Sequence, residues 1–143
     1  MKKSILVFSL FISSLFSCSD SDDNPYEDSV CDQITTVDNS RYKSSQSEGF
    51  LIRSVQIIGN CLVVEIEAGG CSGDTWKVEL IDAGRVAESN PEQSDLKILL
   101  DNQELCYAIV HKTYTFDLRP IQTSNNVVLM NLELWDEQIR YEY

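Results

Sequence analysis

The alternation of apolar and polar residues along most of this chain is the feature that most constrains its fold. From residue 50 onward, short segments repeat with a period of two, the spacing of a strand with one buried face. Residues 61–68 are one example, because Leu62, Val64 and Ile66 are separated by the positions that face the other way. Comparable segments are residues 50–58, 76–80, 96–100, 105–118, 127–135 and 139–143.

Turn-forming residues separate these segments. Gly59-Asn60 predicts a two-residue hairpin, because glycine readily takes the positive φ of a primed turn. Lys112 interrupts the apolar row of segment 105–118, so we expect a β-bulge near His111. Six or seven short strands without an amphipathic helix predict an all-β fold, an antiparallel Ig-like β-sandwich over residues 30–143.

The first 17 residues have the composition of a secretory signal peptide. Lys2 and Lys3 form a positive start, and an apolar run of twelve residues follows at 5–16. A helix of that length is too short to span a bilayer, which needs about 20 apolar residues. We therefore assign residues 1–17 to a signal peptide that is removed from the mature protein.

The end of this segment resembles a bacterial lipobox. Leu15-Phe16-Ser17 precedes Cys18, and the acidic residues 19–24 that follow are similar to those behind the lipid-bearing cysteine of Bacteroidota surface lipoproteins. The resemblance implies lipidation of Cys18, a flexible acidic tether at 18–29, and anchoring in the outer membrane with display on the cell surface. The membrane is then a partner through the N-terminal lipid, and an ordinary signal peptide cut elsewhere is the alternative.

Four cysteines remain when Cys18 carries lipid. An even number in an exported domain predicts two disulfides among Cys31, Cys61, Cys71 and Cys106. Cys61 and Cys71 flank one extended segment and would lie ~30 Å apart, whereas a disulfide needs Cα atoms ~5.5 Å apart. Two pairings remain, and we favour Cys31–Cys61 with Cys71–Cys106.

The charge balance limits the classes of partner. The chain carries 11 Lys and Arg against 23 Asp and Glu, a net charge of −12, and removal of Lys2 and Lys3 takes it to −14. Nucleic acid is excluded as a partner because phosphate binding requires clustered basic residues. A protein or a glycan at the cell surface is the expected partner.

No group of residues predicts a catalytic, metal or cofactor site. Cys71 with His111 could form a nucleophile pair, but a disulfide removes the thiolate that this chemistry requires. Ser72-Gly73-Asp74 lacks the full nucleophile-elbow motif and predicts a turn. The acidic residues at 20–24 lack the spacing of a calcium loop. Three strand carboxylates, Glu65, Glu67 and Glu79, could form an acid–base pair, but solvated strand faces commonly carry such residues.

Aromatic residues provide the candidate ligand site. Tyr107 and Trp135 fall on the face opposite the apolar rows of their segments and could form a flat platform for a sugar or a peptide, with Tyr141 and Tyr143 as further members. Packing in the core or at an edge is the alternative role for these side chains.

Three short stretches resemble small Bacteroidota lipoprotein domains of uncharacterised function, including the sandwich domains of NigD-like lipoproteins. They are residues 70–74, 104–106 and 116–120. The resemblance implies a fold and no activity. The leading hypothesis is a non-enzymatic surface lipoprotein with a binding or envelope-assembly role. The alternatives are an inhibitor or immunity-type lipoprotein that binds a basic protein, and a hydrolase with a carboxylate-based site.

Overall fold

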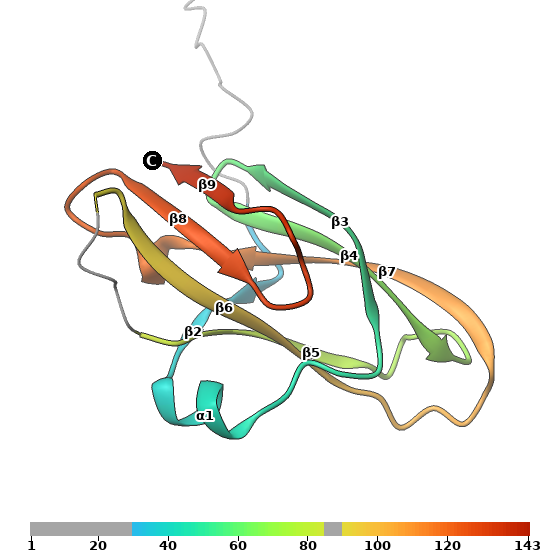
Figure 1. Ribbon diagram of the computed structural model, residues 1–143. Helices are drawn as coiled ribbons and strands as arrows, with labels where there is room; N and C mark the ends of the chain where they lie inside the picture. The colour runs from blue at the N-terminus through green and yellow to red at the C-terminus, as the bar shows by residue number, and fades with distance from the viewer. Residues whose placement is uncertain (1–29, 85–89) are drawn as a thin grey trace, which may run out of the picture.

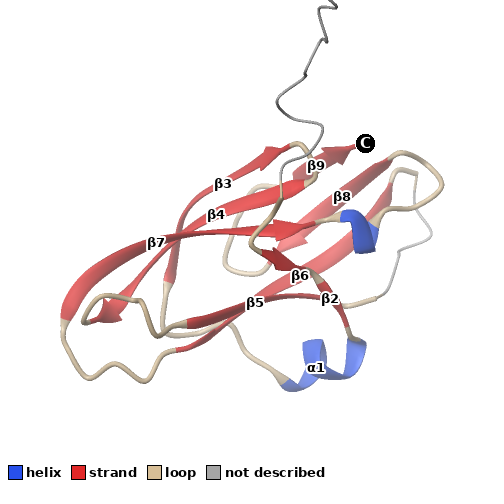
Figure 2. Cartoon of the chain, turned by 180° about the vertical axis from the view of Figure 1, so that it is seen from behind, coloured by secondary structure: helices blue, strands red, loops and turns tan. Residues whose placement is uncertain are grey.

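The computed structural model describes residues 30–84 and 90–143 as two β-sheets packed face to face (Figures 1 and 2). The signal peptide, the lipidated Cys18 and the acidic tether predicted at residues 18–29 lie outside the described residues. The predicted all-β sandwich is confirmed.

The first sheet has four strands and the second has five. The order of the first is β1 (Gln33–Ile34), β7 (Ala108–Asp117), β4 (Cys61–Gly70) and β3 (Leu51–Ile58). The order of the second is β2 (Thr36–Val37), β5 (Lys77–Asp82), β6 (Glu92–Asp101), β8 (Val127–Leu132) and β9 (Ile139–Glu142). A short helix α1 (Asn39–Ser44) follows β2, and a 3-10 turn η1 (Arg119–Ile121) follows β7.

The sheets are mixed, which corrects the expectation of antiparallel strands throughout. The pairs β1–β7, β2–β5 and β6–β8 are parallel. The chain passes from one sheet to the other between β1 and β2 through the single buried residue Thr35. Strands of two residues are too short to show a period, so the sequence pattern does not reveal β1 and β2.

The alternating residues form the core between the sheets. Leu62, Val64 and Ile66 of β4 are fully buried, as the pattern in residues 61–68 predicts. From the opposite sheet, Leu80, Ile98 and Met130 pack into the same cluster and are equally buried. Burial of one apolar face per strand is therefore what joins the two layers.

The predicted hairpin is present. The bulge predicted near His111 is absent, and the register irregularity lies in β3 instead. Gly59 takes a φ of 57° in the turn between β3 and β4. The β4–β7 pairing runs without a shift past His111, and the irregularity lies in β3 between Ile52 and Ser54. Lys112 is accommodated without a bulge because its ammonium reaches the Asp74 carboxylate at 2.6 Å.

Strand β7 begins three residues later than the pattern in residues 105–118 predicts. Its last pair with β4 is Ala108 with Gly70, where β4 itself ends. Residues 102–107 consequently have no neighbouring strand and form a loop, which we call the distal loop.

Both favoured disulfides are present in the structure, and they lie at opposite ends of β4. Cys31 is bonded to Cys61 at the first residue of β4, with Cα atoms 5.7 Å apart. Cys71 follows the last residue of β4 and is bonded to Cys106 of the distal loop, with Cα atoms 4.8 Å apart. One bridge secures the end at which the described chain begins, and the other secures the far end (Figure 1).

Candidate functional site

The distal loop exposes two large apolar side chains. Leu105 is 90% exposed and Tyr107 is 100% exposed. Ile109, at the start of β7, extends this apolar surface and is 70% exposed. In Figure 1 the loop is the orange segment between β6 and β7, at the lower right of the molecule. Exposed side chains of this size gathered at one place are typical of an interaction site.

The carboxylate of Glu104 fixes the middle of this loop. It accepts the backbone N–H groups of Cys71, Ser72 (3.0 Å) and Gly73 (3.0–3.1 Å). It also accepts the hydroxyl of Thr75 at 2.9 Å. We call this arrangement the Glu104 clamp. Successive N–H groups that converge on one anion form a nest, which favours the charged form of the bound group. The N–H of Gly73 is the main cause that lowers the pKa of Glu104 to about 2.

The clamp requires a glycine at position 70. A Cβ atom there would lie 2.6 Å from Oε2 of Glu104 and 2.9 Å from the ring of Trp76. Only a residue without a side chain lets the carboxylate and the indole ring approach the backbone this closely. Gly70 thus has a packing role, as the last residue of β4.

Three alternate residues of the distal loop are held against the domain. The side-chain amide of Asn102 donates to the carbonyl of Gly69 at 2.7 Å. Glu104 sits in the clamp, and Cys106 is bonded to Cys71. Because the residues at 102, 104 and 106 are tied down, the side chains of Leu105 and Tyr107 extend into solvent.

The outer face of the four-stranded sheet carries a charged cluster near this loop. Nδ1 of His111 lies 3.4 Å from Glu65, and its Nε2 lies 3.4 Å from Glu67. The guanidinium of Arg53, at the irregular point of β3, contacts Glu67 at 2.5 Å. Glu79 is on the other sheet, where it pairs with Arg41. The three glutamates therefore do not form one site. His111 lies beside the carboxylates of Glu65 and Glu67, and the sulfur of Cys71 is in a disulfide, so these two residues do not form a nucleophile pair.

A shallow hollow of about 300 Å³ is lined by Glu67 of the charged cluster and by Ile109 at the start of β7. Its floor includes Gly69, above which there is open space, and its sides include the exposed Leu51 and Ile109. Of the exposed apolar residues of the distal loop and the start of β7, Ile109 is the one that lines this hollow.

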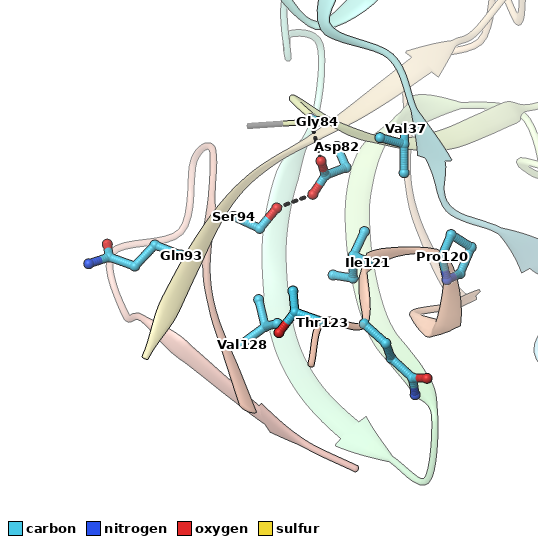
Figure 3. Close-up of a pocket in the computed structure, with 10 residues that line it drawn as sticks. Val37, Asp82, Gly84, Gln93, Ser94, Pro120, Ile121, Thr123 and Val128 are labelled. Atoms are coloured by element: carbon cyan, nitrogen blue, oxygen red, sulfur yellow. Dashed lines mark hydrogen bonds between the residues drawn. The ribbon is translucent and has the colours of Figure 1, made fainter. Parts of the chain in front are cut away.

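A second, smaller pocket lies between the ends of β5, β6 and β8 and the turn η1 (Figure 3). It holds about 130 Å³, and the carboxylate of Asp82 is buried within it. This carboxylate accepts the hydroxyl of Ser94 and the backbone N–H of Gly84. Burial raises the pKa of Asp82 above its ordinary value, against the effect of both hydrogen bonds.

The four aromatic residues of the predicted platform have different surroundings in the structure. Trp135 packs against the core and is only half-exposed, in the turn between β8 and β9. Tyr141 is fully buried, and its hydroxyl donates to Asn60 at 2.6 Å. Tyr143 stacks on Tyr141 with ring centroids 4.8 Å apart. Of the four aromatic residues, Tyr107 is the one whose side chain is fully exposed to solvent and so accessible to a ligand.

Sequence reasoning missed the roles of Glu104 and Asp82. Glu104 lies 31 positions from Gly73 in the sequence, and no local pattern links the two. Asp82 is followed two residues later by Gly84, the spacing of an Asx turn, and this is the local signal that indicates its role.

The described residues contain neither a metal-ligand cluster nor a membrane-spanning helix. Within residues 30–84 and 90–143, no three His, Cys, Asp or Glu side chains are grouped so that they could hold a metal ion. No helix in that part of the chain is long and apolar enough to cross a membrane.

Comparison with known proteins supports the fold. No protein-family model matches the sequence, and no curated protein matches it. A protein of unknown function, DUF1344, from Bacteroides vulgatus matches 78% of this chain with a TM-score of 0.50 and 13% identity. A protein described as toxin related, from Parabacteroides distasonis, matches 78% with a TM-score of 0.48 and 15% identity. This chain spans only 55% and 60% of the length of these two structures.

The Glu104 clamp predicts how stability depends on pH. The folded-state pKa of about 2 is below the ordinary value of 4.5, so the clamp stabilises the fold above pH 4.5 and this contribution is lost as pH falls toward 2. Glu104→Gln should lower the melting temperature at pH 7 and flatten its decline between pH 4.5 and 2, in thermal unfolding followed by circular dichroism. Glu137→Gln, at an exposed position in the turn after β8, is the control. Equal pH profiles for the Glu104→Gln variant and the wild type would show that the clamp does not stabilise the fold.

Proposed function

We propose that this protein is a small Bacteroidota-type, NigD-like lipoprotein that binds a partner protein through its distal loop and has no enzymatic activity. Acylated Cys18 holds it in the outer membrane, with the domain displayed on the cell surface. The observation that carries the proposal is the pair of apolar side chains, Leu105 and Tyr107, which a clamped loop holds in solvent. Two disulfides in the described domain are consistent with export from the cytoplasm.

The fixed geometry of the loop is what favours a binding role. Exposed apolar side chains contribute nothing to the core, yet burial of a leucine-sized side chain in a partner yields about 1.5–3 kcal/mol. Binding by a flexible loop loses part of that free energy to ordering, at about 0.5–1.5 kcal/mol per immobilised side chain. A loop already held at Asn102, Glu104 and Cys106 avoids most of the backbone part of this cost.

The position of the loop suits a protein anchored at its N-terminus. The described chain begins at the end of β4 where Cys31 is bonded to Cys61. The ten residues of β4 separate that end from the distal loop by about 30 Å. The apolar surface thus lies at the end of the domain far from Cys31, near which the described chain begins. The net charge of −14 for the mature chain favours a partner with a basic surface around its apolar cleft.

Lipidation of Cys18 can be tested separately from binding. Cells that express the full-length protein should incorporate labelled palmitate into it, and Cys18→Ala should abolish the label. Protease added to intact cells should degrade the wild-type protein if it is on the surface. Incorporation of label into the Cys18→Ala variant would contradict anchoring at this residue, and full protection from protease would contradict surface display.

Binding through the distal loop can be tested by site-specific photocrosslinking in intact cells. A photoreactive phenylalanine at position 107 should give one dominant crosslinked species, and Leu105→Ser in the same chain should reduce its yield several-fold because an apolar contact is lost. The matched control carries the photoreactive residue at the exposed Glu142 of β9. The same crosslinked species from both positions, or none from position 107, would contradict the proposed surface.

A further inference from the structure

The Asp82 pocket combines a buried carboxylate with apolar walls. Asp82 is 3% exposed at the end of β5, and Ser94, which donates to it, is 5% exposed. No Lys or Arg among the described residues forms an ion pair with Asp82. The carboxylate has room for about four hydrogen bonds, and two are made by Ser94 and Gly84. Burial of a carboxylate without a cationic partner raises the free energy of the folded protein, and binding of a cation would reduce this penalty.

The shape of the pocket limits the size of that cation. Apolar side chains of Val37, Pro120, Ile121 and Val128 line it, together with Gln93, Gln122 and Thr123. The amide of Gln93 points away from the other labelled residues (Figure 3). Val37, Gly84 and Pro120 are exposed, so the pocket has a mouth that opens to solvent. A cavity of about 150 Å³ takes a benzene ring, so the 130 Å³ here would hold roughly five or six heavy atoms.

We propose that the Asp82 pocket binds a primary alkylammonium group, either a free amine or the end of a lysine side chain. Four methylene groups and one nitrogen match the volume, the apolar walls contact the methylenes, and the ammonium pairs with the carboxylate. An arginine side chain fits less well, because its three methylene groups and four guanidinium atoms exceed the roughly five or six heavy atoms that the cavity holds.

This site goes beyond the proposed function and is independent of it. The pocket is built from β2, the end of β5, the start of β6 and η1. The distal loop instead follows β6 and is tied to the residues after β4. Loss of amine binding would leave partner binding at the distal loop unaffected, and the converse also holds.

The test is a titration of the full-length protein with n-butylammonium, followed by NMR chemical shifts, with n-butanol as the uncharged probe of equal length. Saturable shifts should occur at residues that line the pocket, with butanol binding at least tenfold more weakly. Asp82→Asn should also weaken butylammonium binding at least tenfold, because the amide keeps the contacts to Gly84 and Ser94 but carries no charge. The melting temperature of the variant serves as the check on folding.

Asp95→Asn is the matched control, because it removes a neighbouring carboxylate that does not line the pocket and that accepts a hydrogen bond from Asn131. This variant should bind as the wild type does. Affinity should fall as pH decreases through the raised pKa of Asp82, since only the ionised carboxylate attracts the ammonium. N-acetyl-lysine methylamide distinguishes the two sources: binding equal to butylammonium indicates a lysine side chain, and much weaker binding indicates a free amine.

Two results would overturn the inference. One is the absence of saturable shifts at the pocket, and the other is equal binding by the Asp82→Asn variant.

Discussion

The ten-residue antiparallel pairing of β4 with β7 determines where both ends of this domain lie. It runs without a shift from Cys61 opposite Asp117 to Gly70 opposite Ala108. A disulfide adjoins each end, so the segment at which the described chain begins and the distal loop are secured about one strand length apart. Buried side chains of β4 pack against the second sheet, and this contact makes the pairing part of the core.

At the distal end, the backbone itself provides the binding site for a carboxylate. The backbone N–H groups of residues 71–73 have no partner in the sheet because β4 has ended. The carboxylate of Glu104 accepts hydrogen bonds from all three. The Cys71–Cys106 disulfide joins the same two segments two residues further along the loop. The combination explains how a loop outside any strand holds Leu105 and Tyr107 in solvent, where a partner can reach them.

Most of the framework follows from local sequence patterns, whereas the sites depend on contacts between distant residues. The period of two in residues 61–68 predicts the buried face of β4, and Gly59-Asn60 predicts the hairpin. The distance along one strand excludes the Cys61–Cys71 pairing and leaves two schemes, of which the structure contains the favoured one. The parallel strands, the start of β7 and the roles of Glu104 and Asp82 arise from packing of segments that are far apart in the sequence. The partial burial of Trp135 against the core likewise depends on the turn between β8 and β9.

The central claim is that the distal loop is rigid before any partner binds. Backbone ¹⁵N relaxation of the full-length protein measures this directly at residues 102–107. Order parameters for Leu105 and Tyr107 close to the value of about 0.85 found in rigid backbone are the result that the Glu104 clamp and the disulfide predict. Values below about 0.6 at these two residues, with strand values elsewhere, would show a flexible loop and would contradict the account.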